Sequence, residues 1–219
     1  MIKYILFDLD DTLYSTSAGL MHEISERMNE FMITDVGIPP DQVTHIRKDY
    51  WDRYGTTLRG LYIERHIDAQ AFLEFVHDIQ IDRYLQRDER LDGVLERLSQ
   101  DKYVFTNAPA SHARRVLAAL GVERHFIRIF DINFINYESK PTLSAYHKVL
   151  AALPARAGEG LMIDDSARNL APAKALGMRT VLVDGKGLVA PGSPVEGVDE
   201  IITTVYDILN VINDLQKED

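Results

Sequence analysis

Residues 3–14 read Lys-Tyr-Ile-Leu-Phe-Asp-Leu-Asp-Asp-Thr-Leu-Tyr, an apolar run that ends in three carboxylates. The run Lys3–Leu9 is rich in residues that favour strands and predicts a buried strand. Asp8, Asp10 and Asp11 stand at its carboxyl end, where they repel one another unless a positive charge joins them. A charged turn with Asp11 as a helix cap would explain one of the three. The segment therefore predicts a strand that carries a polar site at its end.

The rest of the chain alternates strand-like and helix-like segments. Four further runs predict strands: Lys102–Thr106, Ile127–Asn133, Gly160–Asp164 and Thr180–Val183. Helical periodicity marks Ser111–Leu120, Thr142–Leu153, Ala167–Leu176 and a terminal helix over Val205–Leu215. Strands that alternate with helices of this length indicate βαβ units. We therefore expect an α/β fold with a parallel sheet.

The interval between the first two predicted strands departs from this alternation. It contains only helical stretches, at Gly19–Met32, Pro40–Tyr54 and Asp68–Asp78. An insertion of this length is too long for a loop and predicts a helical subdomain. We therefore expect a catalytic core formed by residues 1–14 and 98–219, with a helical cap domain at 15–97.

Three more polar elements follow predicted strands or precede a predicted helix. They are Thr106-Asn107, Ser139-Lys140-Pro141 and Asp164-Asp165-Ser166. Each is weak evidence alone, because Thr-Asn is common turn chemistry and most lysines are solvated. In a parallel sheet the carboxyl ends of the strands gather at one edge, where ligands bind. Four or five carboxylates gathered there would suit Mg²⁺.

These four motifs, spread from Phe7 to Asn169, resemble those of the haloacid-dehalogenase superfamily of phosphotransferases. The resemblance implies a Rossmann-like core with an inserted cap and phosphatase activity. Asp8 would attack phosphorus and form an aspartyl phosphate, and Asp10 would protonate the leaving alkoxide and then activate water. Thr106 would bind a phosphoryl oxygen, and Lys140 would neutralise negative charge. Because dehalogenases of the superfamily usually lack an acid at the position of Asp10, its presence favours phosphate transfer.

The resemblance also implies a Mg²⁺ site. The ligands would be Asp8, the backbone carbonyl of Asp10, and Asp165, with Asp164 close by. Which of Asp164 and Asp165 binds the ion directly stays open, with Asp165 preferred.

The string Tyr54-Gly55-Thr56-Thr57-Leu58-Arg59-Gly60-Leu61 is similar to the pyrimidine 5′-nucleotidase branch of the superfamily. The similarity implies hydrolysis of UMP or CMP. We expect a ligand-facing loop in which Gly55 and Gly60 allow sharp turns. Thr56, Thr57 and Arg59 would supply donors, and Asn107 would contact phosphate or sugar. Arg59 has an equal claim to a surface ion pair, and Trp51 is expected to pack between cap helices.

Composition limits the partners. The net charge of −10 disfavours nucleic acid polymers and leaves a small phosphorylated metabolite, such as a nucleoside monophosphate, as the expected partner. There are no cysteines, no secretion signal and no apolar stretch long enough for a membrane span, so we expect a cytoplasmic protein. The alternatives are a phosphatase for phosphoglycolate, a sugar phosphate or flavin mononucleotide, and a non-catalytic regulatory protein that binds a phosphometabolite.

Overall fold

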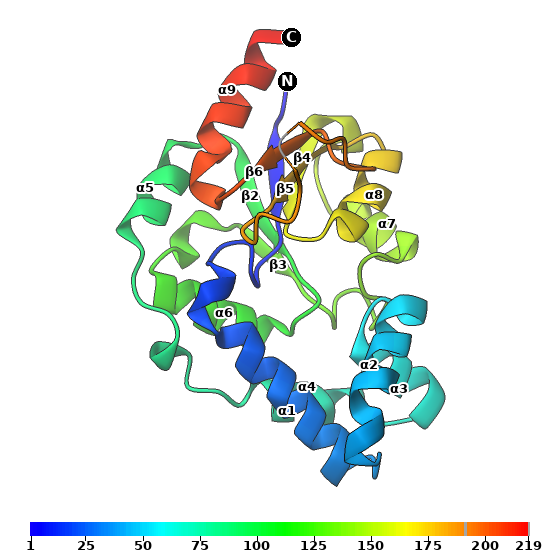
Figure 1. Cartoon of the computed structure of the whole chain (residues 1–219). Coiled ribbons are helices and arrows are strands. Elements are labelled where there is room, and N and C mark those ends of the chain that lie inside the picture. The colour runs from blue at the N-terminus through cyan, green and yellow to red at the C-terminus, as the bar shows by residue number, and fades with distance from the viewer. Residues whose placement is uncertain (191, 219) are drawn as a thin grey trace.

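The core of the protein is a sheet of six parallel strands (Figure 1). The computed structural model describes residues 1–190 and 192–218. The strands are β1 (Tyr4–Phe7), β2 (Asp101–Phe105), β3 (Arg128–Phe130), β4 (Gly160–Asp164), β5 (Arg179–Val183) and β6 (Glu200–Ile202). Their order is β3-β2-β1-β4-β5-β6, and every neighbouring pair is parallel. The predicted α/β fold is confirmed, while the short edge strand β6 was not predicted.

Helices cover both faces of this sheet. They are α5 (Glu89–Arg97), α6 (Ala110–Leu120), α7 (Leu143–Ala151), α8 (Ala167–Ala175) and α9 (Ile208–Glu218). Side chains of β1 alternate between the faces, because successive residues of a strand point to opposite sides. Ile5 and Phe7 pack in the cluster that includes α5, α6 and α9, whereas Tyr4 and Leu6 pack in the cluster that includes α7 and α8. The central strand is therefore buried on both sides.

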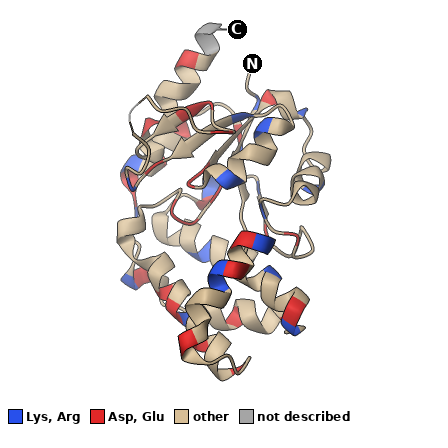
Figure 2. Ribbon diagram, turned by 45° about the vertical axis from the view of Figure 1, so that its right-hand side comes forward, with Lys and Arg blue, Asp and Glu red and all other residues tan. Residues whose placement is uncertain are grey.

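Four helices are inserted between β1 and helix α5 of the core: α1 (Leu20–Thr34), α2 (Pro40–Tyr54), α3 (Thr57–Arg65) and α4 (Ala69–His77). We term these four helices the insertion; Figure 1 shows them beside the end of the sheet at which β1 leaves the core. Acidic and basic residues are interleaved along them (Figure 2), as in the ion pairs of Lys48 with Asp52 and of Arg53 with Asp49. The insertion thus keeps a charged outer surface.

The predicted loop over residues 54–61 is wrong in its second half, which opens helix α3. Thr56 caps this helix, since its hydroxyl accepts a hydrogen bond from the backbone N–H of Arg59. Gly55 has φ +89°, as expected for a sharp turn. Gly60 instead lies inside α3, where an added Cβ would stand 2.2 Å from Cγ of Tyr50. Gly60 therefore serves the close approach of α2 and α3.

Helix α5 falls within residues 15–97 but packs with the core. It contacts α9 and the short helix at Val205–Asp207, and Leu91 and Leu95 belong to the same cluster as Phe7. The division into domains at residues 14 and 97 stays a prediction. The remaining short 3-10 helices are Thr16–Ala18, Ile81–Arg83, Glu123–His125 and Ala157–Glu159. Among the described residues, no helix has the length and apolar character needed to cross a membrane.

Candidate active site

The site is positioned by two adjacent strands. β1 and β4 run parallel with Phe7 opposite Ile163, so Asp8 and Asp164 emerge side by side at the carboxyl edge. The backbone N–H of Asp8 donates to the carbonyl of Ile163 at 2.8 Å, which continues the ladder by one residue. Both carboxylates are buried, Asp164 completely. The register of the sheet therefore places two negative charges together away from water.

Lys140 joins these two carboxylates. Its ammonium lies 2.7 Å from Oδ1 of Asp8 and 2.7 Å from Oδ2 of Asp164, and its side chain is buried. Thr12 donates a further hydrogen bond to Oδ2 of Asp8 at 3.0 Å. Asn107 holds the backbone of Lys140, because its amide accepts from the lysine N–H at 2.8 Å and donates to the lysine carbonyl at 3.2 Å. Asn107 thus has a structural partner that the sequence did not reveal.

A third carboxylate leaves the cluster with an excess of negative charge. Ligand atoms of Asp8, Asp164 and Asp165 all lie within 4.8 Å of one another. Burial, with the charges of Asp164 and Asp165, raises the pKa of Asp8 well above its usual value despite Lys140. Burial, together with Asp164 and Asp11, raises the pKa of Asp165 to about 7. One ammonium does not balance three carboxylates, so this all-oxygen donor set fits a hard divalent cation.

The two adjacent aspartates differ in their remaining contacts. Asp164 is saturated: its Oδ1 accepts from the backbone N–H of Ser166 at 2.9 Å and from Asn169 at 3.0 Å, and its Oδ2 accepts from Lys140. Asp165 lines the cavity described below and accepts no hydrogen bond from another described residue. Asp165 is therefore the carboxylate of this pair with coordination sites to offer.

Asp10 is held by two donors that the sequence analysis missed. Its Oδ1 accepts from Tyr14 at 2.7 Å and from Nε2 of His112 at 2.8 Å. Burial favours a raised pKa for Asp10, but the charge and hydrogen bond of His112, with Tyr14, hold it below the usual value. His112 occupies a buried position on the amphipathic helix α6, where sequence alone indicates packing. Only the folded sheet brings it to Asp10.

A cavity of about 450 Å³ lies over these groups, between the core and the insertion. The core contributes Asp8, Asp10, Thr106, Asn107, Lys140 and Asp165, and the insertion contributes Met21, Met28, Arg47, Trp51, Thr56, Thr57 and Phe72. All six of these core residues were predicted site residues, and so were Thr56 and Thr57 of the insertion. The hydroxyl of Thr106 accepts a hydrogen bond from the N–H of Ala108 at 3.0 Å, and Thr56 lies 3.3 Å from the hydroxyl of Ser139.

Arg59 is not among the residues that line this cavity. Its guanidinium donates to the backbone carbonyl of Tyr137 at 3.3 Å. A role for Arg59 in substrate binding stays a prediction, and such contact would require this bond to break.

Two arginines that were not predicted lie at the cavity instead. Arg47 is partly buried, and the groups that accept its hydrogen bonds are neutral: the carbonyl and hydroxyl of Ser25, the amide oxygen of Asn29 and the sulfur of Met28. Arg168 donates to the backbone carbonyls of Trp51 and Asp52 and lies 4.5 Å from the centroid of the Trp51 ring. Trp51, expected to pack between helices, is 50% exposed.

Comparisons with known proteins agree with this geometry. The family model described as haloacid dehalogenase-like hydrolase matches residues 2–177. Phosphate metabolism protein 8 of Saccharomyces cerevisiae is 26% identical over 197 residues, which cover 82% of this chain and 61% of that protein. The chain thus spans less than two thirds of the length of this curated relative.

Solved structures share the fold at low identity. The Bacillus subtilis hydrolase YfnB, bound to magnesium, has a TM-score of 0.66 at 18% identity, with 97% of this chain and 99% of that chain covered. A phosphatase from Thermococcus onnurineus has a TM-score of 0.66 at 19% identity, with 96% and 98% covered. An L-2-haloacid dehalogenase from Xanthobacter autotrophicus has a TM-score of 0.61 at 15% identity, with 97% and 99% covered. With four motifs gathered at one edge of a parallel sheet and a family match over most of its length, the chain belongs to the haloacid dehalogenase-like hydrolase family.

Proposed function

We propose that the chain is a Mg²⁺-dependent phosphomonoesterase that forms a covalent aspartyl phosphate on Asp8. The observation that carries the proposal is the buried Lys140 ammonium, which bridges Asp8 and Asp164 while Asp165 stays available beside them. This arrangement holds Asp8 in place and supplies positive charge where a phosphoryl group would arrive. Buried carboxylates with raised pKa values are common where a protein carries out chemistry, which favours an enzyme over a binding protein.

The reaction would proceed in two balanced steps. A carboxylate oxygen of Asp8 attacks phosphorus, the bond from phosphorus to the ester oxygen breaks, and the departing alkoxide takes a proton from Asp10. Water then attacks the phosphorus of the aspartyl phosphate while Asp10 accepts one proton of that water, and Asp8 and phosphate are released. The doubly negative phosphate of a bound ester would raise the pKa of Asp10 and so favour its protonated form.

The remaining residues position and neutralise. Lys140 and the hydroxyl of Thr106 would contact phosphoryl oxygens, and Asp164 would act through Lys140. A Mg²⁺ ion held by Asp8, Asp165 and the backbone carbonyl of Asp10 would supply further positive charge for the phosphoryl oxygens. Asn107 would contribute by fixing the backbone of Lys140.

A pyrimidine nucleoside 5′-monophosphate is the proposed substrate. The cavity volume of about 450 Å³ lies in the range of small-molecule sites. Arg47 brings a partly buried positive charge whose hydrogen-bond acceptors are neutral, so it can still donate to the carbonyls of a base. Trp51 offers an exposed aromatic ring at the same cavity, and Thr57 offers a hydroxyl.

The test is phosphate release from UMP, CMP, AMP, GMP, phosphoglycolate and flavin mononucleotide, each with Mg²⁺ and with EDTA. We expect release from UMP and CMP above the others, and its loss with EDTA and in Asp8→Asn. Asp101→Asn, at the exposed amino end of β2, is the matched control. Metal-dependent release that favours another ester would refute the nucleotide substrate and retain the phosphatase.

The hydrolytic step needs its own measurement. A single turnover in ¹⁸O-labelled water should place the label in phosphate, because water attacks phosphorus. Label in the carboxylate of Asp8 would indicate that water attacks the carboxyl carbon, and would refute hydrolysis at phosphorus.

A further inference from the structure

Two hydrogen bonds converge on one oxygen of Asp10 and leave the other available. Tyr14 and His112 both donate to Oδ1, at 2.7 and 2.8 Å. Oδ2 accepts no hydrogen bond from another described residue, and Asp10 lines the cavity. A carboxyl group turns readily about its bond to Cβ, and two donors on a single oxygen oppose that rotation. The pair of donors therefore selects which oxygen can exchange a proton with a ligand.

We propose that His112 is a positioning residue, which orients Asp10 so that Oδ2 faces the leaving oxygen of the ester. The inference rests on the proposed phosphomonoesterase function and assigns to His112 a role that acts only through Asp10. His112 itself does not line the cavity, and its side chain is completely buried.

Packing alone does not account for a histidine at this position. Nδ1 of His112 is buried and has no hydrogen-bond partner among the described residues. An unsatisfied buried nitrogen costs about 1–3 kcal/mol, which an apolar side chain of similar size would avoid. Unsatisfied groups of this kind call for an explanation beyond stability. The bond from Nε2 to Asp10 provides one.

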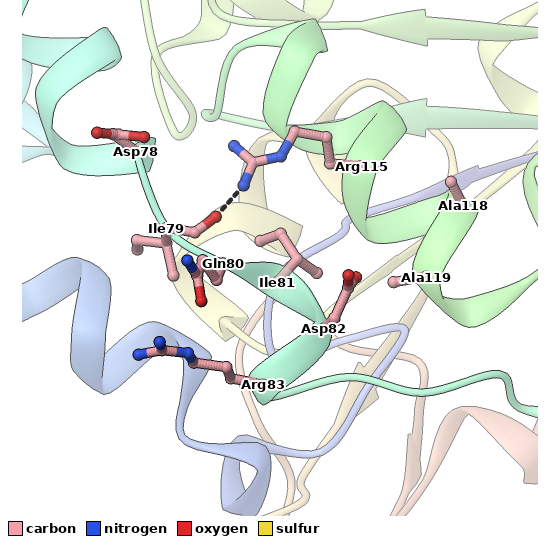
Figure 3. Close-up of a pocket in the computed structure, with 9 residues that line it drawn as sticks. All are labelled: Asp78, Ile79, Gln80, Ile81, Asp82, Arg83, Arg115, Ala118 and Ala119. Atoms are coloured by element: carbon pink, nitrogen blue, oxygen red, sulfur yellow. Dashed lines mark hydrogen bonds between the residues drawn. The ribbon is translucent and has the colours of Figure 1, made fainter.

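The ring of His112 is held by the end of the insertion. His77, in the last turn of α4, lies with its ring centroid 4.5 Å from that of His112, and its Nδ1 donates to the carbonyl of Leu73 at 2.8 Å. Arg115, three residues along α6, donates to the backbone carbonyls of His77 and Ile79; Figure 3 shows its bond to Ile79. Helix α6 thus binds the segment that connects the insertion to the core. The orientation of Asp10 therefore depends on contact between the end of the insertion and helix α6.

The test compares esters that differ in their need for an acid. An alkoxide, as in UMP, requires a proton on departure, whereas p-nitrophenolate leaves as a stable anion. The value of kcat/KM reports the steps up to transfer of phosphate to Asp8, before water is activated. A general acid contributes about 10²–10⁴-fold to such a step. We therefore expect His112→Met to lower kcat/KM for UMP about 100-fold and that for p-nitrophenyl phosphate less than about fivefold.

Two further variants separate positioning from folding. His112→Gln keeps an N–H donor near the position of Nε2 and should restore most of the activity on UMP. Tyr14→Phe removes only a hydroxyl from the same oxygen of Asp10 and should show the same selective loss. His125→Met is the matched control, since Nε2 of His125 bonds to Asp92 at 2.6 Å elsewhere in the core, and both esters should be unaffected.

An equal loss on both esters in His112→Met and Tyr14→Phe would overturn the proposal. So would unchanged hydrolysis of UMP. Crystal structures of the parent protein and of His112→Met give a readout that needs no turnover. A rotated Asp10 carboxyl group in the variant would support the proposal, and an unmoved one would overturn it. If the parent protein hydrolysed no ester, the proposed function would fail, while these structures would still decide the role of His112.

Discussion

Replacement of Asp165 by asparagine should stabilise the metal-free protein at alkaline pH. Asp165 is the third carboxylate of a cluster that contains one ammonium, and its pKa is raised to about 7, first by burial and then by Asp164. The unfolded chain loses this proton near pH 3.8, whereas the native protein retains it until about pH 7. Because the native state binds more protons in this interval, its free energy of unfolding falls as pH rises. Asparagine removes that loss.

The magnitude follows from the structure in two ways. A rise in pKa from 3.8 to about 7 corresponds to about 4 kcal/mol, at about 1.4 kcal/mol for each tenfold change. The carboxylate oxygens lie within 4.8 Å of one another, and at that limiting separation two of them repel by about 3 kcal/mol at an effective dielectric constant of about 20. Asp165 is partly solvated, which weakens both effects. We therefore expect the free energy of unfolding of Asp165→Asn to exceed that of the parent protein by about 2 kcal/mol at pH 8 and by about 1 kcal/mol at pH 5.

The assay is urea unfolding in EDTA at pH 5 and pH 8, followed by circular dichroism. The single tryptophan, Trp51, lies in the insertion and would report only that region. Mg²⁺ at pH 8 should raise the free energy of unfolding of the parent protein and raise that of Asp165→Asn much less. The control Asp101→Asn should follow the parent protein. A parallel pH dependence in Asp165→Asn and the parent protein, or equal stabilisation of both by Mg²⁺, would refute the reasoning.

Three further predictions concern other parts of the site. Lys140→Met leaves two buried carboxylates without their positive partner, so it should lower the free energy of unfolding by about 3–5 kcal/mol at pH 8 and by less at pH 5. Urea unfolding measures both values, and equal losses at the two pH values would contradict this prediction. Gly55→Ala should raise KM for UMP several-fold, because Gly55 has φ +89° and an added Cβ would stand 2.8 Å from Cδ of Pro141. An unchanged KM would show that UMP binding does not depend on the packing of this turn against Pro141. Arg47→Met should raise KM for UMP about tenfold and leave p-nitrophenyl phosphate hydrolysis unaltered, since one lost hydrogen bond to a charged group is worth about 1.5–3 kcal/mol. Equal effects on both esters would argue against contact between Arg47 and the base.

Much of the fold could be predicted because its signals are local. The strands β1, β2, β4 and β5 are apolar runs buried on both faces, and this burial shows directly in composition. Strand β6 escaped prediction because Glu200–Ile202 is short and two of its three residues are exposed, so no apolar run marks it. Helix α3 was taken for a loop because Gly55, Thr56 and Gly60 suit turns. Packing of Gly60 against Tyr50, a contact made only after folding, overrides that preference.

For the site, the sequence by itself determined which residues stand at the ends of strands. Asp8, Thr106 and Asp164 must lie at one edge of any parallel sheet built from these runs. Tertiary structure alone decided the contacts that give them chemistry. It saturates Asp164 and leaves Asp165 available, commits Asn107 to Lys140, and brings His112 to Asp10 across 102 positions of sequence. The physical reason is that burial and charge pairing depend on distances between segments remote in the chain, and helical periodicity marks His112 only as buried.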